Sequence, residues 1–178
     1  MEFISPDPQA TVRAANVRAT LDAFQLRPSI GQRLIQKHQL QLDDLRPEKF
    51  ILVQRWLDAL KEVFETVGPN VLHRVGFAIS QNAEFPPVFD TIDKLFHNMD
   101  MIYYVNHQGD VGHYLTTQKS DGVWEIRCET PYPRHFERGV VEGVCRNPQY
   151  SRGKAYHVEY IEGPPASDLT CTMLVRSV

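Results

Sequence analysis

The chain has 178 residues, of which 42% are hydrophobic, and its 19 basic and 22 acidic residues give a net charge of −3. This balance, together with the absence of a basic tract, argues against a nucleic-acid-binding surface, and the length suffices for one domain, 1–178, with a buried core. No apolar run is long enough to span a membrane and the first eight residues lack signal-peptide features, so we expect a cytoplasmic protein.

Helical periodicity dominates residues 1–98. A first helix is expected to begin near Pro8 and to end before Pro28. The clearest apolar stripe predicts a long buried helix through 50–67, which ends at Gly68-Pro69. The other helices expected in this half are 30–38, 70–81 and 87–98.

Residues 99–178 show the shorter period of strands, interrupted by one helix. A turn is expected at 106–110, and Asp121-Gly122 predicts a tight hairpin. The strands expected here are 101–105, 111–118, 123–128, 155–161 and 169–175. Helices followed by strands indicate an α+β fold, in which a helical layer packs on an antiparallel sheet and a glycine-bearing helix precedes the last two strands.

The glycine-bearing helix follows an aromatic and proline-rich entrance, Thr130–Pro133. Its two glycines, Gly139 and Gly143, each cost about 1 kcal/mol of helix propensity relative to alanine. Such a pair indicates that another backbone or a flat ligand lies against this face, with packing on the sheet as the simpler interpretation.

Three segments of the chain resemble a known superfamily: Tyr103–Gly109, Pro131–Pro133 with Arg138–Gly143, and the last strand, Leu169–Val175. Its members are the heme-nitric-oxide/oxygen-binding (H-NOX) domains, the vinyl-reductase-type ligand-binding domains and the TRAPP vesicle-tethering subunits, which share a helices-then-sheet fold. The last strand is most similar to the Cys-containing final strand of the vinyl-reductase type. The resemblance spans about 70–178 and implies a cytosolic ligand-sensing or assembly module.

The resemblance allows heme as a cofactor, but the residues that hold it in H-NOX domains are not reproduced. A Tyr-x-Ser-x-Arg clamp would fall at Ile126, Cys128 and Thr130, none of which pairs with a propionate. The candidate iron ligand, His97, lies one residue beyond the family's Leu-Asp-x-Leu-His pattern, a rotation of about 100° on a helix. We therefore expect His97 to interact with the helix C-terminus, and heme is the less favoured cofactor.

Other reactive residues do not form a recognisable catalytic or metal motif. The three cysteines, Cys128, Cys145 and Cys171, are expected to be buried free thiols, because they are odd in number and show no C-x-x-C spacing. The candidate histidines are His107, His113 and His135, which flank turns without the spacing of a zinc site. Because no nucleotide-binding glycine loop is present either, an enzyme of the tetrapyrrole-reductase type is disfavoured.

The entrance to the glycine-bearing helix is heavily charged, and we expect a solvated ion-pair face there. Glu142 can pair with Arg138 and with Arg146, each four residues away. As an alternative, Arg134 or Arg138 clamps an acidic ligand at the mouth of a pocket. The charged residues in this region are Arg127, Glu129, Arg134, Glu137, Arg138, Glu142 and Arg146.

The sequence thus predicts a non-catalytic, small-molecule-responsive regulatory domain, and a homodimer formed through the N-terminal helices. An apolar, acidic or tetrapyrrole-like ligand is expected between the helix at 50–67, the sheet face bearing Trp124 and Ile126, and the glycine-bearing helix. An assembly module for a signalling or tethering partner and an H-NOX-like heme gas sensor are the alternatives. The candidate ligand-binding residues are Trp56, Tyr104, Trp124, Arg134, Phe136, Arg138, Gly139 and Gly143.

Overall fold

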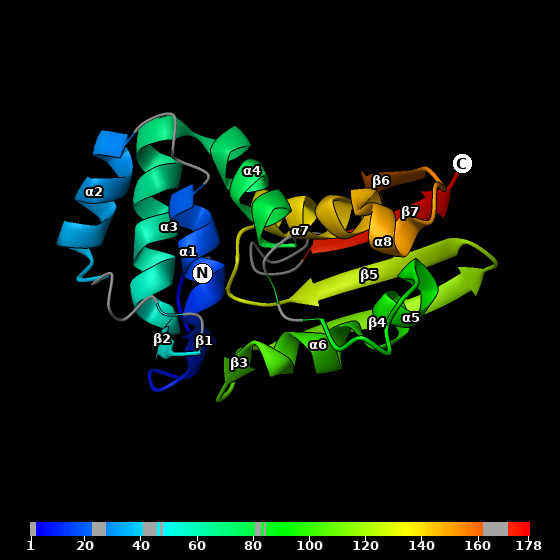
Figure 1. Cartoon of the computed structure of the whole chain (residues 1–178), viewed down its shortest axis with the longest axis horizontal. Helices are drawn as coiled ribbons and strands as arrows, with labels where there is room; N and C mark the ends of the chain where they lie inside the picture. Colours follow the sequence, from blue (N-terminus) through cyan, green and yellow to red (C-terminus); the bar gives the residue numbers. More distant parts are fainter. Residues whose placement is uncertain are drawn as a thin grey trace.

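The computed structural model describes residues 3–22, 28–40, 46, 48–80, 83, 85–161 and 171–178. Figure 1 shows the first three helices on one side of the molecule, the larger sheet on the other, and α4 and α7 crossing between them. The N-terminal helices are α1 (Ala14–Asp22), α2 (Pro28–Lys37), α3 (Val53–Val67) and α4 (Pro69–Ile79). The later helices are α5 (Ile92–His97), α6 (Met99–Val105), α7 (Arg134–Arg146) and α8 (Pro148–Ser151).

Two of the expected helices begin later in the sequence than predicted, because the residues before them form strands of a small sheet. Its strands are β1 (Thr11–Arg13), β2 (Phe50–Leu52) and β3 (His107–Gln108), and β1 lies in the middle, antiparallel to both neighbours. Because 11–13 and 50–52 pair with each other, α1 begins at Ala14 rather than near Pro8, and α3 begins at Val53 rather than at residue 50. β3 ties the C-terminal half to the N-terminal one.

The larger sheet is antiparallel, as expected, with the strand order β4-β5-β7-β6. In β5, Trp124, Ile126 and Cys128 are buried whereas Arg127 is exposed, so the expected alternation is confirmed. The Asp121-Gly122 hairpin is also confirmed, with Gly122 at a φ of +66°. The sequence also predicts a loop at Gly163-Pro164-Pro165 between the last two strands, and this segment lies outside the described residues. The strands are β4 (His113–Ser120), β5 (Val123–Glu129), β6 (Tyr156–Tyr160) and β7 (Cys171–Ser177).

The strand expected at 101–105 is wrong, because these residues form helix α6. Its buried residues Met99, Ile102 and Tyr103 recur at helical spacing, and the next residue in that series, Asn106, is buried as well. Tertiary burial of this stripe outweighs the β propensity of the Ile-Tyr-Tyr-Val run. The preceding helix is shorter than expected, since Thr91 caps α5 by accepting a hydrogen bond from the Lys94 amide at 3.3 Å.

The two glycines of α7 pack against another helix, and not against the sheet. A Cβ on Gly139 would lie 2.1 Å from the carbonyl oxygen of His73 in α4, and one on Gly76 of α4 would lie 2.1 Å from the carbonyl oxygen of Phe136. Gly143 faces Ser80 and Phe77 in the same way. The expectation of a closely approaching backbone is therefore confirmed, and the simpler expectation of packing on the sheet is wrong for this face.

A continuous hydrophobic cluster joins the N-terminal helices to the sheet and includes Trp56, Leu60, Ile126 and Met173. Within the described part of the chain, no helix is both long and apolar enough to cross a membrane.

The close contact predicts the sign of a stability change. In an isolated helix, Gly139→Ala stabilises by about 1 kcal/mol. Here the added methyl group meets backbone that cannot rotate away, so we expect the free energy of unfolding to fall by about 1 to 3 kcal/mol in denaturant titrations. Gly76→Ala, on the opposite side of the same contact, is expected to behave alike. A stabilised Gly139→Ala protein would contradict the helix crossing.

Candidate functional site

An almost wholly apolar cavity of about 80 Å³ lies in the core. Helix α7 supplies Phe136, Val140 and Val144 to its wall, because residues four apart lie on one face of a helix. The other walls come from α1, α3, α4, α5, α6 and β4, and from the segments that follow α4, follow α6 and precede α7. The remaining lining residues are Asn16, Trp56, Ile79, Ala83, Phe85, Leu95, Phe96, Met99, Ile102, Tyr103, Asn106, His107, Tyr114 and Tyr132.

Aromatic rings form the centre of this wall. Trp56 lies 5.1 Å from Tyr132 and 5.5 Å from Phe136, and the last two rings lie 5.0 Å apart, measured between ring centroids. The sequence prediction of Trp56 and Phe136 as wall residues therefore matches their positions. Such tilted aromatic contacts form a rigid surface that suits a flat or compact apolar molecule.

His107 is the histidine found in the lining among the described residues, and both of its ring nitrogens are engaged. A carbonyl only accepts, so Nδ1 carries the proton that it donates to the Tyr103 carbonyl at 2.9 Å, and Nε2 accepts from the Tyr132 hydroxyl at 2.8 Å. Burial lowers the pKa of His107 to about 4, which the hydrogen bond to Tyr103 only partly opposes. The imidazole is therefore neutral and fixed in one tautomer.

A buried carboxyl group lies beside the cavity wall. Glu137 is 1% exposed and accepts hydrogen bonds from the hydroxyl groups of Tyr114 in β4 and Thr130. Burial raises the pKa of Glu137 to about 7, although both hydrogen bonds favour the ionised form. The sequence prediction of a solvated ion-pair face is wrong for this residue, because Glu137 shares a helical face with the buried residues Val141 and Cys145.

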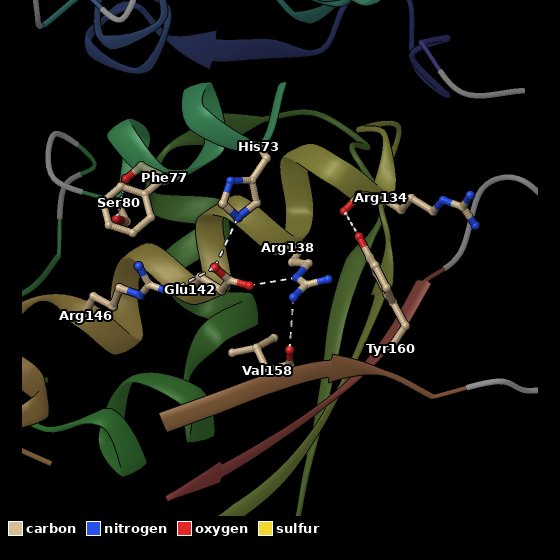
Figure 2. Close-up of polar contacts among 9 residues, drawn as sticks. All are labelled: His73, Phe77, Ser80, Arg134, Arg138, Glu142, Arg146, Val158 and Tyr160. Carbon is tan, nitrogen blue, oxygen red and sulfur yellow. Dashed lines mark hydrogen bonds and ion pairs between the residues drawn. The ribbon is translucent and has the colours of Figure 1, made fainter. Parts of the chain in front are cut away.

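The other charged residues of α7 do form the expected ion pairs, on the side of the helix next to α4 and β6 (Figure 2). Glu142 contacts Arg138 at 2.7 Å and Arg146 at 3.8 Å, and it also bonds His73 of α4 at 3.2 Å. Arg138 further donates to the Val158 carbonyl of β6 at 3.4 Å. These contacts tie α7 to its neighbours.

Several of the predicted ligand-binding residues lie away from the cavity. Arg134 is exposed, and Arg138 is engaged with Glu142. Trp124 donates to Asp93 at 2.8 Å beneath α5, and Tyr104 donates to the Gly112 carbonyl at 3.1 Å. The space over Gly139 and Gly143 is filled by α4. Their roles in binding thus remain predictions that this cavity does not support by position.

The described residues do not fit a heme in this cavity. Phe96 lines it, whereas His97 is exposed and packs edge-on against Trp124 with 6.4 Å between centroids. Thr130, at the position of the clamp's arginine, donates a hydrogen bond to Glu137 and offers no positive charge to a propionate. An engineered apolar cavity of about 150 Å³ accommodates benzene, and a porphyrin is several times larger than benzene.

The remaining histidines and cysteines are accounted for individually. His113 pairs with Asp100 at 3.2 Å, and His135 is half-buried. All three cysteines are buried and free, as the sequence predicts.

Comparison with solved structures identifies the fold as that of H-NOX domains. A crystal structure of an H-NOX protein from S. oneidensis in the Fe(II)NO state aligns with a TM-score of 0.72 at 10% identity, covering 93% of this chain and 99% of that one. An NMR structure of the H-NOX domain from Shewanella oneidensis in the Fe(II)CO state gives 0.65 at 12%, covering 93% and 98%. An unliganded Fe(II) H-NOX mutant from K. algicida gives 0.56 at 11%, covering 93% and 96%. No protein-family model and no curated protein sequence matches the chain.

The shifted pKa values of Glu137 and His107 predict that the stability of the fold depends on pH with opposite signs for the two residues. A raised pKa means that the folded state holds the proton of Glu137 more tightly, so its contribution to stability is complete below pH 4.5 and is lost as the pH rises to about 7. The lowered pKa of His107 acts oppositely, since its contribution is complete above pH 6.5 and is lost as the pH falls to about 4. The two slopes oppose each other over their shared range.

The variant Glu137→Gln has no titrating group at this position, so it lacks the contribution of Glu137 to the pH dependence of the unfolding free energy. We expect the free energy of unfolding of this variant to gain roughly 3 kcal/mol relative to the wild type between pH 4.5 and 7.5, measured by denaturant titration at each pH. A difference between the two proteins that is independent of pH would contradict the buried, protonated carboxyl group.

Proposed function

We propose that the chain is a sensory or regulatory domain that binds a small apolar molecule in the aromatic cavity beneath α7, with 1–178 acting as one ligand-binding domain. The observation that carries the proposal is the cavity itself, with its compact wall of Trp56, Tyr132 and Phe136. Ligand sites are typically preformed, mostly apolar and equipped with few polar groups. The H-NOX fold supports the assignment by analogy only.

A ligand in this cavity would act on α7 directly. Phe136, Val140 and Val144 contact the ligand space, while Glu142 on another face of the same helix joins α4. A ligand that favours one position of α7 therefore shifts the population of α4–α7 arrangements, which a partner protein can read. Binding without catalysis, a cytoplasmic location and a homodimer through the N-terminal helices belong to the same proposal, as does a closer relation to the vinyl-reductase type than to H-NOX sensors.

Heme sensing is the second candidate function, favoured by the Fe(II) states named for the structural neighbours. Against it stand the engaged nitrogens of His107 and the position of His97 outside the cavity. An assembly role without a ligand is the third candidate, and it requires that the cavity bind nothing.

Heme sensing is tested by absorption spectroscopy. Protein produced with ample heme is expected to show no stoichiometric Soret band, because the lining offers iron no free imidazole. A stoichiometric band that disappears in His97→Ala or in His107→Ala would overturn this expectation and favour the heme sensor.

Ligand binding is tested with furan, a compact five-membered apolar ring. At ten times its Kd, furan is expected to stabilise the protein by about 1.4 kcal/mol, a rise of a few degrees in Tm. Val140→Phe fills the cavity and is expected to abolish this rise. Val71→Phe serves as the control, because Val71 is also a half-buried valine but lies on α4 and outside the cavity lining. This variant should retain the rise in Tm. A wild-type Tm that does not respond would contradict the proposed function.

A further inference from the structure

One buried polar atom of a residue in the cavity wall lacks a hydrogen-bond partner among the described residues. Asn16 of α1 is 3% exposed and lines the cavity, and its Oδ1 accepts no hydrogen bond from the described part of the chain. An unpaired buried acceptor costs about 1 to 3 kcal/mol, so such groups are rare and often mark a missing ligand or water. The Asn16 carbonyl is therefore a feature that the apolar packing of the wall does not explain.

The hydrogen-bond network fixes which end of the Asn16 amide is unpaired. Asn106 donates from Nδ2 to the Ile102 carbonyl at 3.1 Å, so its Oδ1 must face Asn16. Asn16 then has to present Nδ2 to that oxygen, at 3.5 Å, which leaves its own Oδ1 free. The 3.5 Å contact is long and the terminal torsion of asparagine is broad, so a small rotation can turn Oδ1 toward a bound molecule.

The hydroxyl and indole donors of the wall are already engaged in hydrogen bonds. The hydroxyl groups of Tyr103, Tyr114 and Tyr132 donate to the Val111 carbonyl, to Glu137 and to His107, respectively. The indole of Trp56 donates to Thr20 at 3.3 Å. The hydroxyl and indole donors of the wall are thus not available to Asn16 Oδ1. A ligand with an N–H or O–H group could supply the donor that this oxygen lacks.

We infer that the cavity selects a small, compact, mostly apolar molecule carrying one N–H or O–H group, which donates to Asn16 Oδ1. This inference rests on the proposed function and names the ligand chemistry of the same site. The volume of about 80 Å³ favours molecules smaller than benzene, and the aromatic wall favours a flat ring. A ligand that is only an acceptor gains nothing from Asn16.

Pyrrole and furan test this selectivity, because they are five-membered rings of similar shape and only pyrrole has a donor. By calorimetry or by thermal shift, pyrrole is expected to bind the wild type about three- to tenfold more tightly than furan. Asn16→Leu removes the acceptor and should bring the ratio of the two Kd values close to one, while furan still binds. Ser151→Ala, which alters a buried polar residue outside the lining, should retain the wild-type ratio.

The outcomes separate this inference from the proposed function. Furan binding without a preference for pyrrole would overturn the inference and leave the proposed function standing, whereas binding of neither ring would contradict the proposed function. A preference that persists in Asn16→Leu would exclude Asn16 as the acceptor. If that variant does not fold, NMR on the wild type decides: a nuclear Overhauser effect between the pyrrole N–H and the Asn16 side-chain amide supports the inference, and its absence in the saturated complex overturns it.

Discussion

The backbone contact between α4 and α7 determines what every face of α7 can do. Gly76, Gly139 and Gly143 allow the two helices to approach so closely that any side chain at these positions would collide with the other helix. Because this face of α7 must lie against α4, the orientation of α7 about its own axis is fixed. Phe136, Val140 and Val144 then line the cavity, and Glu137 points toward Tyr114 and Thr130. The position of the cavity thus follows from two helices that touch through their glycines.

Burial favours the neutral forms of the two titratable residues beside the cavity. Glu137 and His107 would each be charged over part of the range from pH 4 to 7 in water, and in the folded chain desolvation favours the uncharged form of both. Each of the two also has hydrogen-bond partners among its buried neighbours. A heme would require an imidazole for its iron and a cation for its propionates, but both nitrogens of His107 are engaged and no described lysine or arginine lines the cavity. The wall of the cavity is therefore suited to uncharged molecules.

Much of the fold could be predicted from the sequence, where the local signals were long or strongly periodic. The extent of α4, the glycine-bearing helix and the hairpin at Asp121-Gly122 all agree with the structure. The three-residue strands β1 and β2 could not be found, because strands so short have no periodicity and depend on partners far along the chain. Helix α6 was missed because its β-branched and aromatic residues obscured the helical spacing of its buried positions.

Some residues of the cavity lining could be identified from the sequence, for a similar reason. Trp56 and Phe136 were found because large aromatic residues on apolar helix faces are usually buried. Glu137 was misread as solvated, although its spacing of four from Val141 was available as a signal. His107 appeared to be a turn residue, and only the distant Tyr132 reveals its role in the wall. Asn16 had no signal in the sequence, since its unpaired oxygen results from the orientation of Asn106.

Close packing of α4 on α7 leaves an apolar cavity that can hold a guest molecule. A crystal structure determined under xenon pressure would show this, because xenon binds in dry apolar cavities and is easily located by its scattering. We expect xenon density among Trp56, Phe96 and Phe136, with α4 and α7 in unchanged contact. Side chains filling this space, with xenon found only at the surface, would contradict it.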